Sequence, residues 1–193
     1  LYNTLDTIVW MAEFNDSKRV VEVTKSLAQY FRLALNQGHE QISLRDEIDH
    51  VRQYLFIQKQ RYGDKLQYEI EEDESLADYK LPKLVLQPLV ENAIYHGLKY
   101  KESKGLLQVK GFMEDGNAVL QVIDNGVGMD EETLSHIYDK HKVNYHSNGV
   151  GVYNVQKRLK LYYGENYGIA YESEKGVGTT ATITIPGIQE ESI

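Results

Sequence analysis

The chain has 193 residues, and its 21 basic and 29 acidic side chains give a formal net charge of −8 at pH 7. This acidic balance argues against a nucleic-acid surface, because phosphate backbones are bound by clustered Lys and Arg. The absence of Cys excludes disulfides and thiolate metal sites. No stretch approaches the roughly 20 apolar residues that span a bilayer, so we expect no direct membrane contact by this segment.

Residues 1 to about 64 are predicted to be helical throughout. The chain opens with Leu1 rather than Met, inside what already reads as a helix, and this predicts a piece of a longer protein. Asn15-Asp16-Ser17 offers an N-cap for one helix that closes at Gly38, and Ser43 to Asp46 resembles a capping box for the next. Two apolar stripes follow, Val20, Val23, Leu27, Tyr30 and Ala34, and then Leu44, Ile48, Val51 and Leu55.

The alternating steps of three and four in these stripes are typical of packed helices. Simple core packing explains each residue taken singly. Narrow apolar seams bury little surface alone, however, so we also expect these helices to form a homodimer.

After Tyr62-Gly63-Asp64 the pattern changes to that of a mixed domain, residues 65–193. Leu66, Tyr68 and Ile70 alternate as in a strand, whereas the acidic run 69–74 is predicted to be a solvated loop. Pro82 is expected at a helix start, and Pro88 is expected to kink that helix or keep its first turns open.

The remaining elements complete an α+β pattern, in which helices cover one side of a sheet. A hairpin is predicted over 105–114 and 117–124, with a turn at Glu114 to Asn117. Short helices are predicted over 130–138 and 152–163, the latter stopped by Gly164. Strands at 168–174 and 179–185 alternate Thr with apolar residues, which indicates one wet and one buried face.

Three motifs carry the candidate chemistry: residues 89–97 (LVENAIYHG), 122–128 (VIDNGVG) and 148–154 (NGVGVYN). Asp124 ends an apolar strand, where a carboxylate needs a partner such as the exocyclic amine of adenine. Capping of its own Asp-Asn-Gly turn is the competing explanation. Gly126 and Gly128 favour a ligand, because they let the backbone adopt positive φ and approach it closely.

The first motif supplies a candidate metal ligand. Asn92 lies on an otherwise apolar helix, and a neutral amide oxygen suits Mg²⁺, which takes few protein ligands and fills its octahedron with phosphates and water. His96 follows one turn later on the same face. It is a candidate contact for phosphate or ribose, although a core hydrogen bond explains it equally well.

The third motif supplies a candidate phosphate site. Gly149 and Gly151 directly precede a helix, whose free N–H groups suit anions. The polar segment 129–148, which contains Lys140, His141, Lys142 and His146, is predicted to be a lid over the nucleotide or else a plain surface loop.

In this order, the three motifs resemble the N, G1 and G2 boxes of the GHKL ATPase superfamily, which includes gyrase, Hsp90, MutL and histidine kinases. The resemblance covers about residues 65–187 and implies a Bergerat α/β sandwich that binds ATP with Mg²⁺. It also implies that Thr179 contacts adenine together with Asp124.

The amino-terminal half resembles the LytS/YehU-type sensor histidine kinases more narrowly. Residues 1–8 (LYNTLDTI) are similar to the segment that follows the phosphoacceptor His in that family, so the acceptor would lie just upstream of Leu1. Residues 87–93 (QPLVENA) and the stretch from Asn154 through Arg158 and Leu159 to Tyr163 and Gly164 fit the same family. Residues 1–64 then correspond to a dimerisation and phosphotransfer segment without its acceptor.

Three departures from the wider family affect the chemistry. The acceptor His is absent, Tyr95 stands where many kinases carry Lys, and Pro88 stands where many ATPases place a Glu base. We therefore look to Lys99, Lys140 or Lys142 for phosphate charge. Glu91 neighbours Asn92 but projects about 100° away around the helix, so its use as a base stays an open hypothesis.

The resemblance implies the catalytic core of a bacterial membrane sensor kinase. Its cytoplasmic ATP-binding domain would pass the γ-phosphoryl group to the upstream His and then to a response-regulator Asp. This segment alone is expected to bind ATP without phosphorylating itself. The alternatives are an anti-sigma-type serine kinase and a non-catalytic GHKL dimerisation or scaffold module.

Overall fold

The computed structural model describes residues 2–35, 40–137 and 149–187. The helices are α1 (Tyr2–Glu13), α2 (Ser17–Ala34), α3 (Leu44–Tyr62), α4 (Gln87–Asn92), α5 (Glu131–Ser135) and α6 (Gly149–Tyr163). The strands are β1 (Gln41–Ser43), β2 (Leu66–Glu72), β3 (Lys80–Pro82), β4 (Gly105–Glu114), β5 (Asn117–Asp124), β6 (Gly168–Glu174) and β7 (Gly178–Pro186). None of the helices in these described ranges is long and apolar enough to cross a bilayer.

The predicted helix starts at Asp16 and Ser43 are confirmed. The Asp16 carboxylate accepts a hydrogen bond from the Arg19 N–H at 3.2 Å, and the Ser43 hydroxyl accepts one from the Asp46 N–H at 3.1 Å. Each bond satisfies a backbone donor that the first helical turn leaves free. Gly38, the predicted end of α2, lies outside the described residues.

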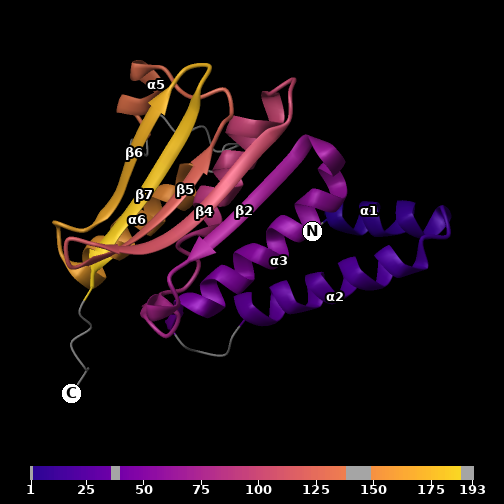
Figure 1. The fold of residues 1–193 in the computed structure, drawn as a ribbon, viewed down its shortest axis with the longest axis horizontal. Helices are drawn as coiled ribbons and strands as arrows, with labels where there is room; N and C mark the ends of the chain where they lie inside the picture. The colour runs from indigo at the N-terminus through magenta and orange to yellow at the C-terminus, as the bar shows by residue number, and fades with distance from the viewer. Residues whose placement is uncertain (1, 36–39, 138–148, 188–193) are drawn as a thin grey trace.

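Strands β2, β4, β5, β7 and β6 form one sheet in that order, with β2 parallel to β4 and the other neighbours antiparallel. The predicted hairpin is confirmed: β4 and β5 are joined by Asp115 and Gly116, both at positive φ, as a tight hairpin turn requires. Figure 1 shows α6 behind the sheet, α3 along β2, and α1 and α2 on the side of α3 away from the strands.

The sheet is buried on one face, as the alternating pattern predicted. Leu107 and Val109 of β4 and Leu120 and Val122 of β5 belong to the core with side chains of α4 and α6. Burying each such side chain contributes roughly 1.5–3 kcal/mol. The opposite face carries side chains of intermediate exposure, so the helices cover one side only.

The helical segment is not a separate layer with its own core. Leu44, Ile48, Val51 and Leu55 of α3 share the core cluster with the sheet strands. The expectation that residues 1–64 are helical throughout is wrong at β1, which pairs antiparallel with β3. Residues 41–43 form a strand because β3, about 40 residues further along the chain, supplies the backbone hydrogen-bond partners.

Two further expectations are wrong. The acidic run predicted as a loop continues β2 to Glu72, because its backbone pairs in parallel with β4 while Arg52 and Lys110 meet its carboxylates. Pro82 does not begin a helix; it ends β3, and Pro88 occupies the first turn of α4 instead. Pro at that position removes an N–H that has no intrahelical partner anyway.

Candidate functional site

The ends of two neighbouring strands bring Asp124 and Thr179 together. They are direct partners in the register of β5 with β7. The Asp124 side chain is 6% exposed, and its Oδ1 accepts a hydrogen bond from the Gly126 N–H at 2.8 Å. Burial raises the pKa of Asp124 to about 6, although the Gly126 N–H, Lys101 and the Thr179 N–H favour the ionised form. A carboxylate that is buried with spare acceptor capacity suits a neutral ligand donor.

The loop after β5 makes close backbone approaches that only glycine permits. Gly128 has φ +62°, and a Cβ there would lie 1.9 Å from the Glu174 carbonyl oxygen. A Cβ on Gly126 would lie 2.4 Å from the carbonyl carbon of Gly97, and the Gly97 oxygen accepts from the Val127 N–H at 3.2 Å. The second motif is therefore clamped between the end of the first motif and the β6–β7 turn.

Asn92 is the last residue of α4, and a π-helical turn, Ala93–Gly97, follows it directly. The wider π turn changes the direction of the chain at this point, and such turns are frequent at functional sites. The Asn92 Oδ1 atom is buried and has no hydrogen-bond partner among the described residues. A buried amide oxygen without a partner is costly unless a ligand satisfies it. The described residues contain no group of three His, Asp or Glu side chains that could hold a metal by themselves.

His96 projects from the π turn and remains exposed. Its pKa is lowered, first by partial desolvation and then by the neighbouring Lys99 ammonium. A neutral imidazole at this position can donate or accept a hydrogen bond at neutral pH.

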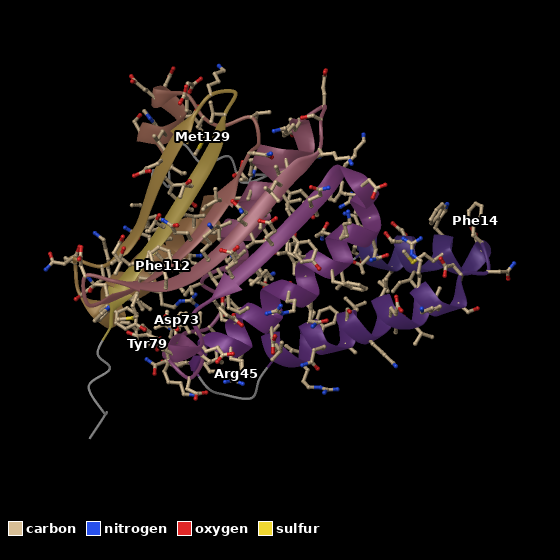
Figure 2. The ribbon with its side chains drawn as sticks, in the orientation of Figure 1. Phe14, Arg45, Asp73, Tyr79, Phe112 and Met129 are labelled. Atoms are coloured by element: carbon tan, nitrogen blue, oxygen red, sulfur yellow. The ribbon has the colours of Figure 1, made fainter. Side chains whose placement is uncertain are left out.

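These side chains line one cavity of about 570 Å³, which is called the nucleotide cavity after the ligand that the sequence predicts. Its lining is Leu89, Asn92, Ala93, His96, Gly97, Val122, Asp124, Gly128, Met129, Glu132, Thr133, His136, Ile137, Tyr171, Thr179 and Ala181. Figure 2 shows Met129 at the end of the sheet opposite to Asp73 and Tyr79. The Met129 N–H donates to the Ser173 hydroxyl at 2.8 Å, which ties this rim to β6. Mostly apolar walls with a few convergent polar groups are typical of a small-molecule site.

The structure therefore gathers five of the predicted site residues in one place, namely Asn92, His96, Asp124, Gly128 and Thr179. Gly126 contacts this group indirectly, because its N–H donates a hydrogen bond to the Asp124 carboxylate.

The third motif is arranged differently from the prediction. Gly149 and Gly151 do not precede a helix; they form the first turn of α6. A Cβ on Gly151 would lie 3.2 Å from the Pro88 Cβ, so this glycine lets α6 pack closely on α4. Helix formation extends into the motif because this packing outweighs the low helix propensity of glycine. The predicted lid residues Lys140, His141, Lys142 and His146 lie outside the described residues.

Glu91 and Lys99 face a different space, the helix-side cavity, of about 590 Å³. It is lined by Asn3, Thr4, Leu27, Tyr30, Phe31, Tyr54, Ile57, Gln58, Glu91, Tyr95, His96, Lys99 and Tyr100. Glu91 accepts a hydrogen bond from the Gln87 amide at 2.7 Å. Lys99 is not among the described residues that line the nucleotide cavity, and of those residues His96 alone borders both spaces.

Sequence reasoning missed the residues that close the cavity from α5 and β6. Glu132, Thr133 and His136 come from α5 and its end, and Tyr171 comes from β6. The strand alternation at 168–174 shows which residues share a face with Tyr171, but no pattern shows which other elements reach that face.

A mixed sheet covered by helices on one face, with a strand-end Asp and a helical Asn lining one cavity, is typical of the Bergerat class of ATP-binding domains. Residues 77–189 match the family model described as histidine kinase-, DNA gyrase B- and HSP90-like ATPase, and residues 1–66 match a histidine kinase model. The chain belongs to the histidine kinase-, DNA gyrase B- and HSP90-like ATPase family.

Named relatives place the chain near sensor kinases, as the resemblance predicted. It is 33% identical over 186 residues to the sensor histidine kinase YesM of Bacillus subtilis, covering 96% of this chain and 31% of YesM. It is 33% identical over 169 residues to the sensor protein LytS of Oceanobacillus iheyensis, covering 86% of this chain and 29% of LytS. The chain thus spans about a third of the length of these relatives.

Solved structures support the fold. The histidine kinase domain of a blue-light activated kinase from Erythrobacter litoralis aligns with a TM-score of 0.56 at 18% identity, covering 94% of this chain and 87% of that one. The α+β architecture, a helical segment followed by a Bergerat domain, is confirmed by this agreement.

Proposed function

We propose that this chain is the catalytic core of a two-component sensor histidine kinase, which binds Mg-ATP and transfers its γ-phosphoryl group to a His of the longer protein. The observation that carries the proposal is the nucleotide cavity, where the buried Asp124 carboxylate and the unpartnered Asn92 oxygen line one space. Neither the anti-sigma-type serine kinase nor the scaffold alternative is favoured by the matches.

Asp124 and Thr179 recognise the base in this proposal. The Asp124 carboxylate accepts a hydrogen bond from the exocyclic amine of adenine, and Thr179 lies beside it in the register of β5 with β7. The apolar walls from Val122 and Ala181 exclude water from the rings, which strengthens this polar contact. His96, which lines the same cavity, is proposed to contact ribose or phosphate.

Asn92 fits a magnesium ion at the phosphates. Its buried amide oxygen is a hard, neutral ligand without a protein partner, and one or two such ligands are typical of Mg²⁺ sites completed by phosphates and water. When bound, the ion neutralises the charge of the triphosphate and orients it for transfer. Gly128 and the backbone amides of the Gly149–Gly151 turn are proposed to approach the nucleotide from the two ends of segment 129–148.

In the transfer step, the bond between the γ-phosphorus and the ADP oxygen breaks while a bond to an imidazole nitrogen forms. The attacking nitrogen uses its lone pair, ADP leaves, and the proton on the other ring nitrogen passes to a base. Glu91 faces the helix-side cavity rather than the nucleotide. We therefore assign Glu91, as a candidate base, to the acceptor side of the reaction, where an imidazole and not a water molecule would be its partner.

The helices α1 and α2 are proposed to form the homodimer. Leu5, Val9 and Trp10 of α1 and Phe14, directly after it, are 43%, 57%, 54% and 67% exposed, a run of large apolar side chains that a second copy would cover. Trp10→Asp should shift the chain from dimer to monomer in sedimentation equilibrium, and an unchanged mass would remove α1 from the interface. In the longer protein the phosphoryl group would pass to a response-regulator Asp, from a cytoplasmic domain of a bacterial membrane protein.

Radiolabelled ATP tests the activity itself. The full-length protein should acquire label that is lost in acid and kept in base, as expected for phosphohistidine, and Asn92→Ala should lower the rate of labelling at least tenfold. The 193-residue chain should bind ATP and stay unlabelled. Acid-stable label would indicate a serine kinase, and acid-labile label on this chain alone would contradict the expected position of the acceptor.

A further inference from the structure

Glu47 of α3 is a buried carboxylate outside both cavities. Its side chain is 0% exposed, and its two oxygens accept hydrogen bonds from the backbone N–H groups of Leu84 and Leu86, each at 2.8 Å. Both donors belong to the loop that leads into α4. Burial raises the pKa of Glu47, whereas the backbone N–H donors and the Arg158 guanidinium favour the ionised form. In either protonation state the two oxygens accept from the loop, so Glu47 holds its backbone.

The same loop is held from a second side by α6. The Arg158 guanidinium, half-buried, donates from Nη2 to the Leu84 carbonyl oxygen at 3.1 Å. Between these two contacts Leu84 adopts φ +58°, a left-handed conformation that is unfavourable for a residue with a branched side chain. Such strain persists where surrounding contacts determine the backbone. Glu47 and Arg158 together supply those contacts.

The clamped loop sets the start of the helix that carries Asn92. The Leu86 carbonyl oxygen accepts hydrogen bonds from the N–H groups of Leu89 and Val90 at 3.1 and 3.0 Å, so Leu86 joins the loop to the first turn. Asn92 lies six residues further on, roughly 9 Å along the helix axis. A short helix transmits a displacement of its first residue to its last, and a metal ligand tolerates little displacement.

We propose that Glu47 is a positioning residue for Asn92: through the backbone of residues 84–86 it holds α4 so that the Asn92 oxygen is presented to the metal bound at the phosphates. This inference rests on the proposed function, because it assigns Asn92 to Mg²⁺. It also makes α3, a helix of the amino-terminal segment, part of the geometry of the nucleotide site. Adenine, held by Asp124 on the strands, does not depend on this clamp.

The proposal predicts that loss of the Glu47 contact weakens the metal-dependent part of ATP binding and leaves the adenine-dependent part unchanged. Calorimetric titration of the chain with ATP, once with excess Mg²⁺ and once with EDTA, measures the two contributions. Glu47→Gln places an amide N–H₂ against a backbone N–H, so it should weaken Mg-ATP binding at least tenfold while ATP in EDTA binds within twofold of wild type. Asp49→Asn, on the same helix with an exposed carboxylate, should leave both affinities unchanged.

Asn92→Ala should give the same metal-specific loss, and the double variant Glu47→Gln/Asn92→Ala should lose no more than either alone. Equal weakening with and without Mg²⁺ would show a merely structural role and overturn the proposal, as would unchanged Mg-ATP affinity. If Glu47→Gln does not fold, Arg158→Lys, which loses the contact with the Leu84 oxygen, decides by the same criteria. Wild-type chain that binds ATP in neither buffer would contradict the proposed function itself.

Discussion

The nucleotide cavity and the helix-side cavity lie on two sides of the same turn of chain, and they are built differently. In the nucleotide cavity the polar groups come from strand ends and from α4, and Asp124 is held by the backbone of its own loop. In the helix-side cavity they come from α1, α2, α3, α4 and the turns after α4. One lining residue, Gln58, is 6% exposed, and its Oε1 has no partner among the described residues.

Adjacent residues serve the two spaces because a helix rotates about 100° per residue. Asn92 faces the nucleotide cavity, Glu91 faces the helix-side cavity, and His96 borders both. The first motif thus separates two cavities, and its opposite faces contribute different side chains to them. Substitutions on its two sides should therefore have separable effects.

The largest expected difference is between Asp124→Asn and Glu91→Gln. The first replaces the acceptor of the adenine amine by an amide that also presents a donor, so ATP affinity should fall at least about 100-fold, on the order of 3 kcal/mol. The second changes a side chain on the opposite side, so affinity should stay within about twofold. Calorimetry with Mg-ATP measures both. Retained affinity in Asp124→Asn would remove Asp124 from the site. A large loss of affinity in Glu91→Gln would show that the two sides of the first motif are not independent.

On the helix side, the free energy of unfolding should depend on pH through a buried histidine. His50 of α3 is 1% exposed and stacks on Tyr30 at 4.4 Å between ring centroids, and burial lowers its pKa to about 4. Because the unfolded chain binds a proton near pH 6.5 and the folded chain does not, stability falls as pH drops from about 6.5 to 4. The shift corresponds to about 3 kcal/mol.

Urea unfolding of the wild type and of His50→Phe, between pH 7 and pH 4, measures this contribution. The variant cannot titrate at position 50, so its free energy of unfolding should fall by about 3 kcal/mol less over this range than that of the wild type. Parallel curves for the two proteins would show that His50 accepts a proton in the folded state.

The nucleotide side should respond to pH in its affinity, with a smaller effect. The pKa of Asp124 is about 6 in the folded chain, and only the ionised carboxylate accepts the adenine amine without presenting a proton. Affinity should therefore fall about tenfold from pH 7 to pH 5. Adenosine, which carries no phosphate to titrate, isolates the Asp124 contribution and should show this tenfold fall. An adenosine affinity that is flat over this range would mean that Asp124 is already ionised at pH 5 or makes no contact.

Sequence patterns predicted those elements that are determined by contacts between neighbouring residues. The side-chain caps at Asp16 and Ser43, the turn at Asp115 and Gly116, and the alternation of β7 were all predicted from neighbouring residues and are confirmed. The order of the three motifs was also sufficient to predict the family, because each motif sits at the end or start of an element where its spacing is fixed by the fold.

Tertiary contacts decided what local patterns could not. The acidic residues 69–72 form a strand because β4 offers a parallel edge, and the Gly149–Gly151 turn is helical because Pro88 packs against it. The clamp on α4 was invisible in the sequence for the same reason: Glu47 meets residues that are 37 and 39 positions away. The amphipathic pattern of α3 does not indicate which backbone the Glu47 side chain contacts.

The sequence by itself determined the kind of site, since Asp124, Asn92 and their glycines specify which ligand atoms can be held. Only the tertiary structure decided which residues share a space, that Glu91 and Lys99 line the helix-side cavity, and that Glu47 of α3 contacts the loop before the helix that carries Asn92. The physical reason is that chemical type is a property of one residue, whereas proximity depends on the packing of helices and strands far apart in the chain.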